Sequence, residues 1–351
     1  MSTSVGLPTR HALGLAVIDT NLKRVAFGVL AVLIVIFPFV GSPFLIDLVN
    51  QVLLASIAAI ALMLLTGFAG QISLGHAGFL ATGAFTVGIL ANEFGSTFWV
   101  TLPIAALAGA TLGLIFGLPS LRLRSLYLGI STLGLHFVVI YIGNEYQARR
   151  GLNTGLAVDP PSIGGLVLTG GRTWYVVFML ATIATVLFSL NLLRTRTGRA
   201  WKAVKDREIV AEALGINVVH AKLSAFIVSS IITTLAGALF AYFRNFVSID
   251  AFDLYLGIQY VAMVIIGGMG SILGAILGAA FVVLFPYAIE FGANFLPTRF
   301  ASQIFALNYS AFGLVMMLFL LFEPQGLVGI WRRVQNYFRL WPFKRLPRGR
   351  L

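Results

Sequence analysis

Ten long apolar segments constrain the fold of this 351-residue chain more than any other feature of its sequence. Most approach the length of about 20 residues that a helix needs to cross a bilayer, and they lack the alternating pattern of outer-membrane barrel strands. Hydrophobic residues make up 59% of the chain and charged residues only 10%, whereas soluble domains carry about 25% charged residues. The sequence therefore predicts an all-α polytopic integral membrane protein, with spans at residues 25–45, 47–66, 72–92, 97–120, 126–143, 173–193, 223–243, 257–271, 273–291 and 304–322.

The distribution of Lys and Arg predicts the orientation of these spans. With both termini in the cytoplasm, 19 of the 24 basic residues fall in cytoplasmic segments, and those outside are Arg149, Arg150, Arg172, Arg244 and Arg299. Cytoplasmic loops of membrane proteins carry such an excess. We therefore expect a cytoplasmic segment at 1–24, a membrane domain at 25–330 with an external loop at 144–172, and a basic cytoplasmic tail at 331–351. The net charge of +12 then belongs to the membrane edges and not to nucleic-acid binding.

The longest charged insert lies at 194–222, between two apolar runs. It is predicted to be helical and exposed to water, with Asp206 as a candidate N-cap and Gly215 as a left-handed stop. Helical spacing places an apolar face between them, formed by Ile209, Val210, Ala213 and Leu214. From the residues alone, two interpretations remain open: an ordinary basic cytoplasmic loop, or an element that docks on another protein.

A second polar segment interrupts the apolar pattern at Gly67–Gly78, with the sequence GFAGQISLGHAG. A discontinuous helix near the bilayer midplane can offer backbone groups and small polar side chains to a substrate. The alternative is a polar, glycine-rich helix contact in which His76 bonds a neighbour. The candidate pathway residues are Gly67, Gly70, Gln71, Ser73, Gly75 and His76.

Glycines with four-residue spacing predict close helix packing in two further places. These are the series Gly109, Gly113, Gly117 and the series Gly270, Gly274, Gly278. The segment GGMGS at Gly267–Ser271 joins two short apolar runs, which suggests broken or re-entrant helices there.

Several function classes are disfavoured by what the sequence lacks. No Asp, Glu, Lys or Arg occupies the centre of a predicted span, so the chain has no buried carboxylate of the kind that ion-coupled carriers use. It has no cysteine, no predicted metal site, no paired carboxylates for hydrolysis and no G-x-x-x-x-G-K-[ST] phosphate loop. We therefore expect a transport subunit without catalytic residues or a bound cofactor. A passive channel or secondary carrier and a lipid-modifying membrane enzyme are the alternatives.

The basic tail after FEPQGLVGIWRR has its own pattern. Trp331, Val334, Phe338 and Trp341 share one face of a short helix that Pro342 would end. This predicts an amphipathic helix on the anionic lipid surface, with a frayed tail as the alternative.

Four blocks resemble the membrane subunits of branched-chain amino acid ABC importers, in particular the LivM type. They are Leu65–Phe79 (LTGFAGQISLGHAGF), Glu212–Phe226 (EALGINVVHAKLSAF), Met263–Gly278 (MVIIGGMGSILGAILG) and Phe322–Trp331 (FEPQGLVGIW). The resemblance implies the permease fold of an ABC importer in the bacterial cytoplasmic membrane. It also implies partners: a homologous second permease, two cytoplasmic ATPases that use ATP and Mg²⁺, and an external solute-binding protein.

On this resemblance the 194–222 insert is expected to be the coupling loop that docks on the ATPase. Its candidate coupling residues are Asp206, Glu208, Ile209, Glu212, Ala213, Leu214 and Gly215. The resemblance implies import of branched-chain or other hydrophobic amino acids. Departures from the family pattern, such as Phe137 at a commonly acidic position, keep urea, short amides and small carboxylates as alternative substrates.

Overall fold

The computed structural model describes residues 36–120, 125–151, 155–163, 166–293, 304–323 and 325–340. Within these ranges, eight helical segments are long and apolar enough to cross a membrane, which confirms the predicted all-α membrane fold. They are α2 (Pro43–Leu62) with its π-helical continuation η1 (Met63–Phe68), α3 (His76–Phe94), α4 (Phe98–Ser120), α5 (Ser125–Arg149), α6 (Gly171–Arg194), α9 (Val218–Arg244), η2 (Ile249–Phe252) with α10 (Leu254–Gly267), and α11 (Ile272–Ala293).

These eight segments correspond to the second through ninth predicted spans. The tenth predicted span corresponds to α12 (Ile304–Phe322), of which Tyr309–Phe319 is the apolar part within the described residues. Most of the first, 25–45, lies outside the described residues. The GGMGS segment forms a turn between α10 and α11, in which Gly268 and Gly270 have φ angles of 106° and 86°. The packing described below lies within residues 48–351.

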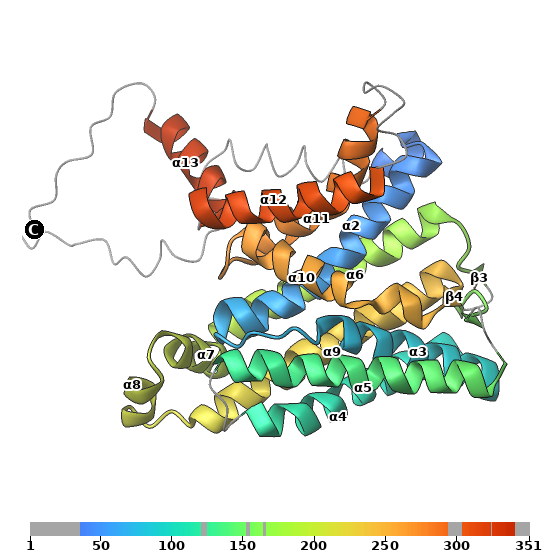
Figure 1. Cartoon of the computed structure of the whole chain (residues 1–351), viewed down its shortest axis with the longest axis horizontal. Coiled ribbons are helices and arrows are strands. Elements are labelled where there is room, and N and C mark those ends of the chain that lie inside the picture. The colour runs from blue at the N-terminus through green and yellow to red at the C-terminus, as the bar shows by residue number, and fades with distance from the viewer. Residues whose placement is uncertain are drawn as a thin grey trace, which may run out of the picture. The chain divides into compact units, whose positions relative to one another are not determined.

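The connections between the helices gather at two ends (Figure 1). The insert end carries α7 (Arg196–Asp206) and α8 (Glu208–Ala213). The loop end carries β1 (Leu156–Ala157) paired antiparallel with β4 (Phe246–Val247), and β2 (Ser162–Ile163) paired with β3 (Leu166–Val167). The Asn92 side chain donates a 2.6 Å hydrogen bond to the Ala157 carbonyl, so the described part of the predicted external loop is an ordered cap.

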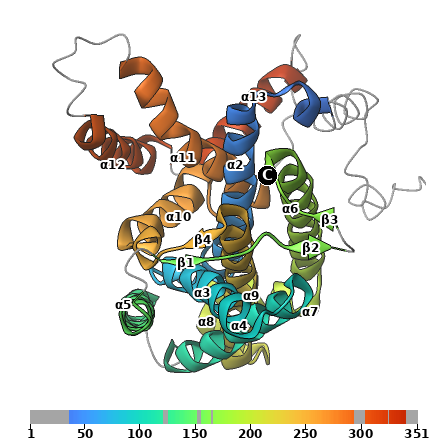
Figure 2. The same cartoon turned by 90° about the vertical axis from the view of Figure 1, so that its right-hand side faces the viewer.

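Small residues bring α3, α4 and α9 into backbone contact near the bottom centre of Figure 2. A Cβ at Gly83 of α3 would overlap the Thr234 carbonyl oxygen of α9, and one at Gly237 would overlap the Leu80 carbonyl oxygen. Such close approach maximises van der Waals contact where no hydrophobic effect drives helices together. The predicted packing role of the α4 series is confirmed, since α9 atoms lie against Gly109, Gly113 and Gly117.

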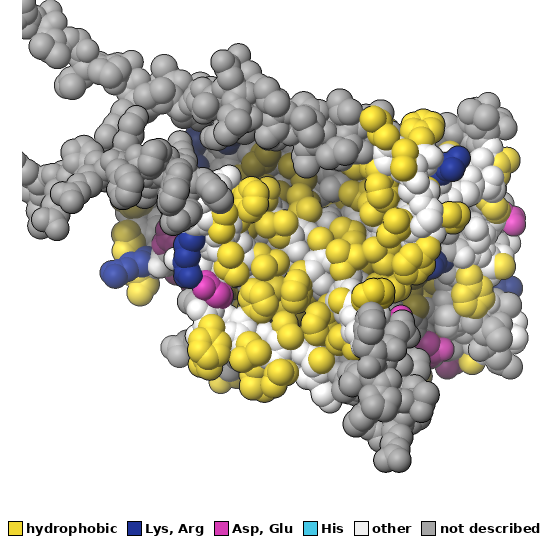
Figure 3. Space-filling model, turned by 90° about the horizontal axis from the view of Figure 1, so that it is seen from above, with side chains coloured by type: hydrophobic (Ala, Val, Ile, Leu, Met, Phe, Trp, Pro, Cys, Tyr) yellow, Lys and Arg dark blue, Asp and Glu magenta, His cyan; other side chains and the backbone are white. Residues whose placement is uncertain are grey.

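The lateral surface is apolar. Figure 3 shows one face, on which hydrophobic side chains cover the middle while the visible charged side chains lie toward the left and right edges. Large apolar side chains also project outward from α4, α5 and α6, among them Trp99, Leu107, Phe137, Tyr141, Leu180 and Leu187. An exposed apolar surface of this extent is typical of a protein surrounded by lipid or by other membrane subunits.

The C-terminal helix α13 (Gly326–Leu340) confirms that the basic tail begins as a helix. Trp331 and Val334 are exposed on it, and Arg333 donates hydrogen bonds of 2.6 and 3.0 Å to the Glu323 carboxylate. Trp341 and Pro342 lie outside the described residues.

Candidate functional site

The predicted interruption is a break between two helices. The α2–η1 helix ends at Phe68, residues 69–75 run back without helical structure, and α3 begins at His76. His76 lies against Ala58, which is near the middle of the α2–η1 helix. α3 therefore starts partway along the bundle, as the chain trace in Figure 1 shows, and the predicted discontinuous helix is confirmed.

Neighbouring helices supply hydrogen bonds that this non-helical segment cannot make internally. The Leu74 amide donates to the Thr132 hydroxyl of α5 over 3.0 Å, and the Gln71 side chain donates to the Lys222 carbonyl of α9 over 2.9 Å. The Thr66 hydroxyl donates to the Gln71 carbonyl. Irregular backbone at membrane depth requires such partners, because lipid offers none.

His76 joins three helices at the start of α3. It is buried, and its Nε2 lies 2.9 Å from the Ala58 carbonyl oxygen. Because a carbonyl only accepts, Nε2 carries the proton in this bond. The Thr233 hydroxyl of α9 lies 3.3 Å from the same nitrogen, and the His76 ring meets the Tyr260 ring of α10 edge to face at 5.3 Å. His76 is thus a hydrogen-bonded interior residue.

The other candidate pathway residues divide between two depths. Gly67, Gly70 and Gln71 lie toward the insert end, where they meet residues of the insert. Ser73 and Gly75 lie deeper and are buried; a Cβ at Gly75 would overlap the Thr132 carbonyl oxygen. The Ser73 hydroxyl has no hydrogen-bond partner among the described residues.

The insert folds as two helices. α7 is anchored by Trp201, which is fully buried and donates a 3.0 Å hydrogen bond to the Ser224 hydroxyl, and by the buried Val204. This packing holds the helix together through Asp206, so the prediction that Asp206 is an N-cap is wrong: it is the last residue of α7. The N-cap of α8 is Arg207, whose side chain makes no capping bond.

α8 presents apolar side chains away from its own chain. Ile209 is 84% exposed and Leu214, directly after the helix, is 75% exposed. The helix is tethered from its other side by the buried Ala211 and by an ion pair between Glu208 and Lys222. Val210, Glu212 and Ala213 are also exposed. The predicted left-handed stop is confirmed, because Gly215 has a φ of 81°.

The end of α7 touches both irregular segments of the bundle. The Lys205 ammonium donates a 2.6 Å hydrogen bond to the Gly67 carbonyl of η1. Gly67 also packs against Gly270, which lies in the turn between α10 and α11. The Gly270 amide lies 3.2 Å from the Met63 sulfur. The insert, the interrupted helix and the glycine turn therefore meet at one place.

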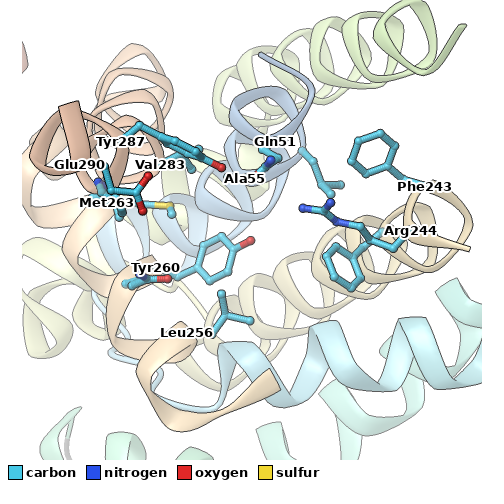
Figure 4. Close-up of a pocket in the computed structure, with 15 residues that line it drawn as sticks. Gln51, Ala55, Phe243, Arg244, Leu256, Tyr260, Met263, Val283, Tyr287 and Glu290 are labelled. Carbon is cyan, nitrogen blue, oxygen red and sulfur yellow. The ribbon is translucent and has the colours of Figure 1, made fainter. Parts of the chain in front are cut away.

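A cavity of about 350 Å³ lies between α2, α9, α10 and α11 (Figure 4). Buried side chains line its interior: Leu54, Ala55, Tyr260, Met263 and Val282. Arg244 and Glu290 are exposed and reach toward it from opposite sides, with the Tyr260 side chain between them (Figure 4). His76 packs behind Tyr260 but is not itself a lining residue, and neither are the other five candidate pathway residues.

Sequence reasoning missed this cavity. It counted Arg244 only as an external charge. Arg244 and Glu290 carry opposite charges at the ends of two apolar runs, and this was a usable signal. A second cavity of about 510 Å³, between α2, α4, α6 and α9, is lined by apolar side chains apart from Thr185. Within the described ranges, no group of three or more His, Cys, Asp or Glu side chains could hold a metal ion.

A bundle of membrane-crossing helices with a discontinuous helix, a cavity flanked by opposite charges and a tethered amphipathic insert defines a multi-pass membrane transport protein. Residues 44–321 match the family model for the permease component of the branched-chain amino acid transport system. The chain belongs to this family, whose members are transport subunits. No solved structure is significantly similar to it.

Several relatives carry the same family description in their names. The high-affinity branched-chain amino acid transport system permease protein LivM of Salmonella typhimurium is 31% identical over 90% of this chain and 77% of its own. LivM of Escherichia coli is 32% identical over 90% of this chain and 78% of its own. A probable LivM of Methanocaldococcus jannaschii is 28% identical over 64% of this chain and 66% of its own.

Proposed function

We propose that this permease moves branched-chain amino acids into the cell, driven by ATP that partner subunits hydrolyse. The proposed assembly contains a homologous second permease, two cytoplasmic ATPases that bind ATP and Mg²⁺, and an external solute-binding protein. The proposed location is the bacterial cytoplasmic membrane, with the insert end and both termini in the cytoplasm. The names of the LivM relatives support the substrate, and the excess of Lys and Arg in the insert supports the orientation.

One observation carries the proposal that the insert docks on an ATPase. Ile209 and Leu214 expose most of their surface on a helix whose neighbours in the chain are strongly basic, a composition that belongs in water and not in lipid. Apolar side chains held in water by a tethered helix are typical of a helix that fits into a groove on a partner. The exposed Glu212 and Ala213 would form the rest of the contact, while Glu208 supports it by tethering α8 to Lys222.

The same insert offers a mechanical route into the membrane domain. Lys205 bonds the η1 helix end, and the Lys222 carbonyl holds the Gln71 side chain. A movement of α7 and α8 on an ATPase would therefore act directly on the segment that precedes α3. We assign Ser73, Gly75 and His76 a bracing role in this pathway, since none of them lines the cavity and His76 packs against the lining residue Tyr260.

The proposal is tested by replacing the exposed apolar residues at α8 with charged ones. Burial of a Leu or Ile side chain is worth about 1.5–3 kcal/mol, so Ile209→Asp or Leu214→Asp should reduce ATPase co-purification by about tenfold or more. Val167→Asp is the matched control, because Val167 is also exposed but lies in β3 at the loop end. Undiminished ATPase binding by both α8 variants would refute docking through the insert.

The substrate is tested separately in vesicles that contain the full transporter and its binding protein. ATP-dependent uptake of labelled leucine should be blocked by unlabelled valine and isoleucine and not by urea, acetamide or acetate. Import of one of the latter compounds without import of leucine would replace the substrate class while leaving the ABC permease assignment in place.

A further inference from the structure

We propose that the cavity between α2, α9, α10 and α11 is a binding site for the zwitterionic group of an amino acid, with Arg244 for the carboxylate and Glu290 for the ammonium. This inference rests on the proposed function and adds to it a site within the permease itself. It assigns the recognition of substrate to residues outside the Gly67–Gly78 interruption.

The cavity combines two opposite charges with an apolar interior. Its volume of about 350 Å³ is at the lower end of the range for small-molecule sites, which suits a solute of amino-acid size. The buried Leu54, Met263 and Val282 offer a surface for an aliphatic side chain. Arg244 and Glu290 approach the cavity from opposite sides (Figure 4), so it offers one cationic and one anionic side chain to a bound solute.

Contacts among the described residues do not explain the two charges. Among the described residues, neither Arg244 nor Glu290 forms an ion pair; the Arg244 guanidinium lies 5.3 Å from the centre of the Phe243 ring. Arg244 ends α9, where the helix dipole favours a cation. Glu290 lies in the last turns of α11, where the dipole disfavours a carboxylate, so helix position gives no reason for its charge.

A break in the α11 hydrogen-bond ladder leaves a backbone acceptor about two helical turns before Glu290. Pro286 lies inside α11 and has no N–H, so the carbonyl of Val282, four residues earlier, receives no helical hydrogen bond from it. Both residues line the cavity. The α11 wall of the cavity therefore carries an acceptor in addition to the Glu290 carboxylate, which favours a donor-rich group such as an ammonium on that side.

Tyr260 completes the site from α10. Its side chain projects between Arg244 and Glu290 (Figure 4), and its ring rests against His76 at the start of α3. The hydroxyl can donate to a carboxylate or accept from an ammonium. Because of this contact, a movement of His76 at the start of α3 would shift the Tyr260 side chain and alter its contact with the bound solute.

The charge pattern distinguishes the candidate substrates. A zwitterion uses both Arg244 and Glu290, whereas a small carboxylate uses only Arg244 and is repelled by Glu290. Urea and amides are neutral and gain little from either charge. The site is therefore specific for the amino-acid class.

The test measures direct binding to the complete permease–ATPase complex, purified without the solute-binding protein. The readout is the concentration of L-leucine, 4-methylpentanoate or 3-methylbutylamine that half-saturates the shift in its thermal unfolding temperature. The wild-type complex should bind leucine at least about tenfold more tightly than either ligand that carries one charge, because each lost charge contact is a charge-assisted hydrogen bond. Equal or weaker binding of leucine would overturn the proposal, even if the transporter imports leucine.

Two variants then test the contributions of Arg244 and Glu290 separately. Arg244→Gln should weaken leucine binding by about tenfold or more and leave 3-methylbutylamine unchanged. Glu290→Gln should weaken leucine similarly and leave or strengthen 4-methylpentanoate. Arg149→Gln and Glu145→Gln are matched controls, because these residues form an exposed ion pair on α5 away from the cavity. Wild-type leucine binding by both cavity variants would also overturn the proposal, and a variant that does not assemble leaves the comparison of wild-type ligands to decide it.

Discussion

The ammonium of Lys205, near the end of α7, donates a 2.6 Å hydrogen bond to the carbonyl oxygen of Gly67 in η1. Carbonyls at the end of a helix lack donors from their own helix, so a side chain from the insert supplies one here. The cation also lies at the negative end of the η1 dipole, which strengthens the contact. One hydrogen bond thus links the insert to the helix that breaks inside the membrane.

Replacing this lysine should separate ATP hydrolysis from transport. Lys205→Met keeps the length of the side chain but removes the donor, so a movement of α7 is transmitted less effectively to η1. We expect ATPase co-purification to be retained and the amount of leucine imported per ATP to fall severalfold. Arg199→Met is the control on the same helix, since Arg199 bonds only the nearby Arg194 carbonyl among the described contacts. A wild-type ratio of uptake to hydrolysis in Lys205→Met would show that coupling takes another route.

The turn after α8 should require a residue at position 215 that accepts a left-handed backbone conformation. Gly215 has a φ of 81°, and a β-branched side chain there costs on the order of 1–3 kcal/mol of backbone strain. Gly215→Val should therefore displace Leu214 and weaken ATPase binding while the membrane helices stay folded. Gly215→Asn is the control, because Asn accepts left-handed backbone conformations. The check is ATPase co-purification at matched expression. Equal loss of binding in both variants would show that any side chain at this position interferes, whatever its backbone preference.

An adverse charge on the same surface gives an independent test. Ala213 is exposed in the last turn of α8, and Ala213→Glu would place an unpaired carboxylate in the proposed contact. We expect loss of binding-protein-stimulated ATP hydrolysis in reconstituted vesicles, with normal thermal stability of the isolated permease. Stimulation at the wild-type level would remove Ala213 from the docking surface.

The interrupted helix should be sensitive to a single methyl group. A Cβ at Gly75 would overlap the backbone carbonyl of Thr132, so Gly75→Ala must move α3 away from α5. We expect a destabilisation of about 1–3 kcal/mol, seen as a lower thermal unfolding temperature in detergent. Gly134→Ala in α5 meets no atom within 4 Å and should be neutral or stabilising. Comparable unfolding temperatures for the two variants would contradict the tight contact at Gly75.

The proposed orientation has a simple readout. A reporter enzyme that is active only outside the cytoplasm should be silent when fused after Leu351, and active when inserted in the loop between α5 and α6. The expectation follows from the basic residues of the insert and tail. Activity at Leu351 would invert the topology and place α8 outside the cell.

The membrane fold could be predicted from the sequence because apolar runs report helix length directly. The break at Gly67–Gly78 was also predictable, since glycines with Gln71, Ser73 and His76 are costly in a continuous membrane helix. The extent of α7 was not, because it depends on Trp201 and Val204 packing against other helices, and this tertiary contact overrides the capping preference of Asp206. Arg244 and Glu290 were missed as a pair because only the folded bundle brings the ends of α9 and α11 to one cavity.

The late start of α3 has a consequence for how the chain is made. When a ribosome has just completed α3, residues 69–75 have neither Thr132 nor the Lys222 carbonyl to bond, because both lie later in the sequence. Backbone N–H and C=O groups without hydrogen-bond partners do not enter hydrocarbon. This segment must therefore stay at the bilayer surface or inside the insertion machinery until its partners are made. We expect stable insertion of α3 to coincide with the arrival of α9, which makes biogenesis of this half of the bundle a single late event and not a succession of independent helices.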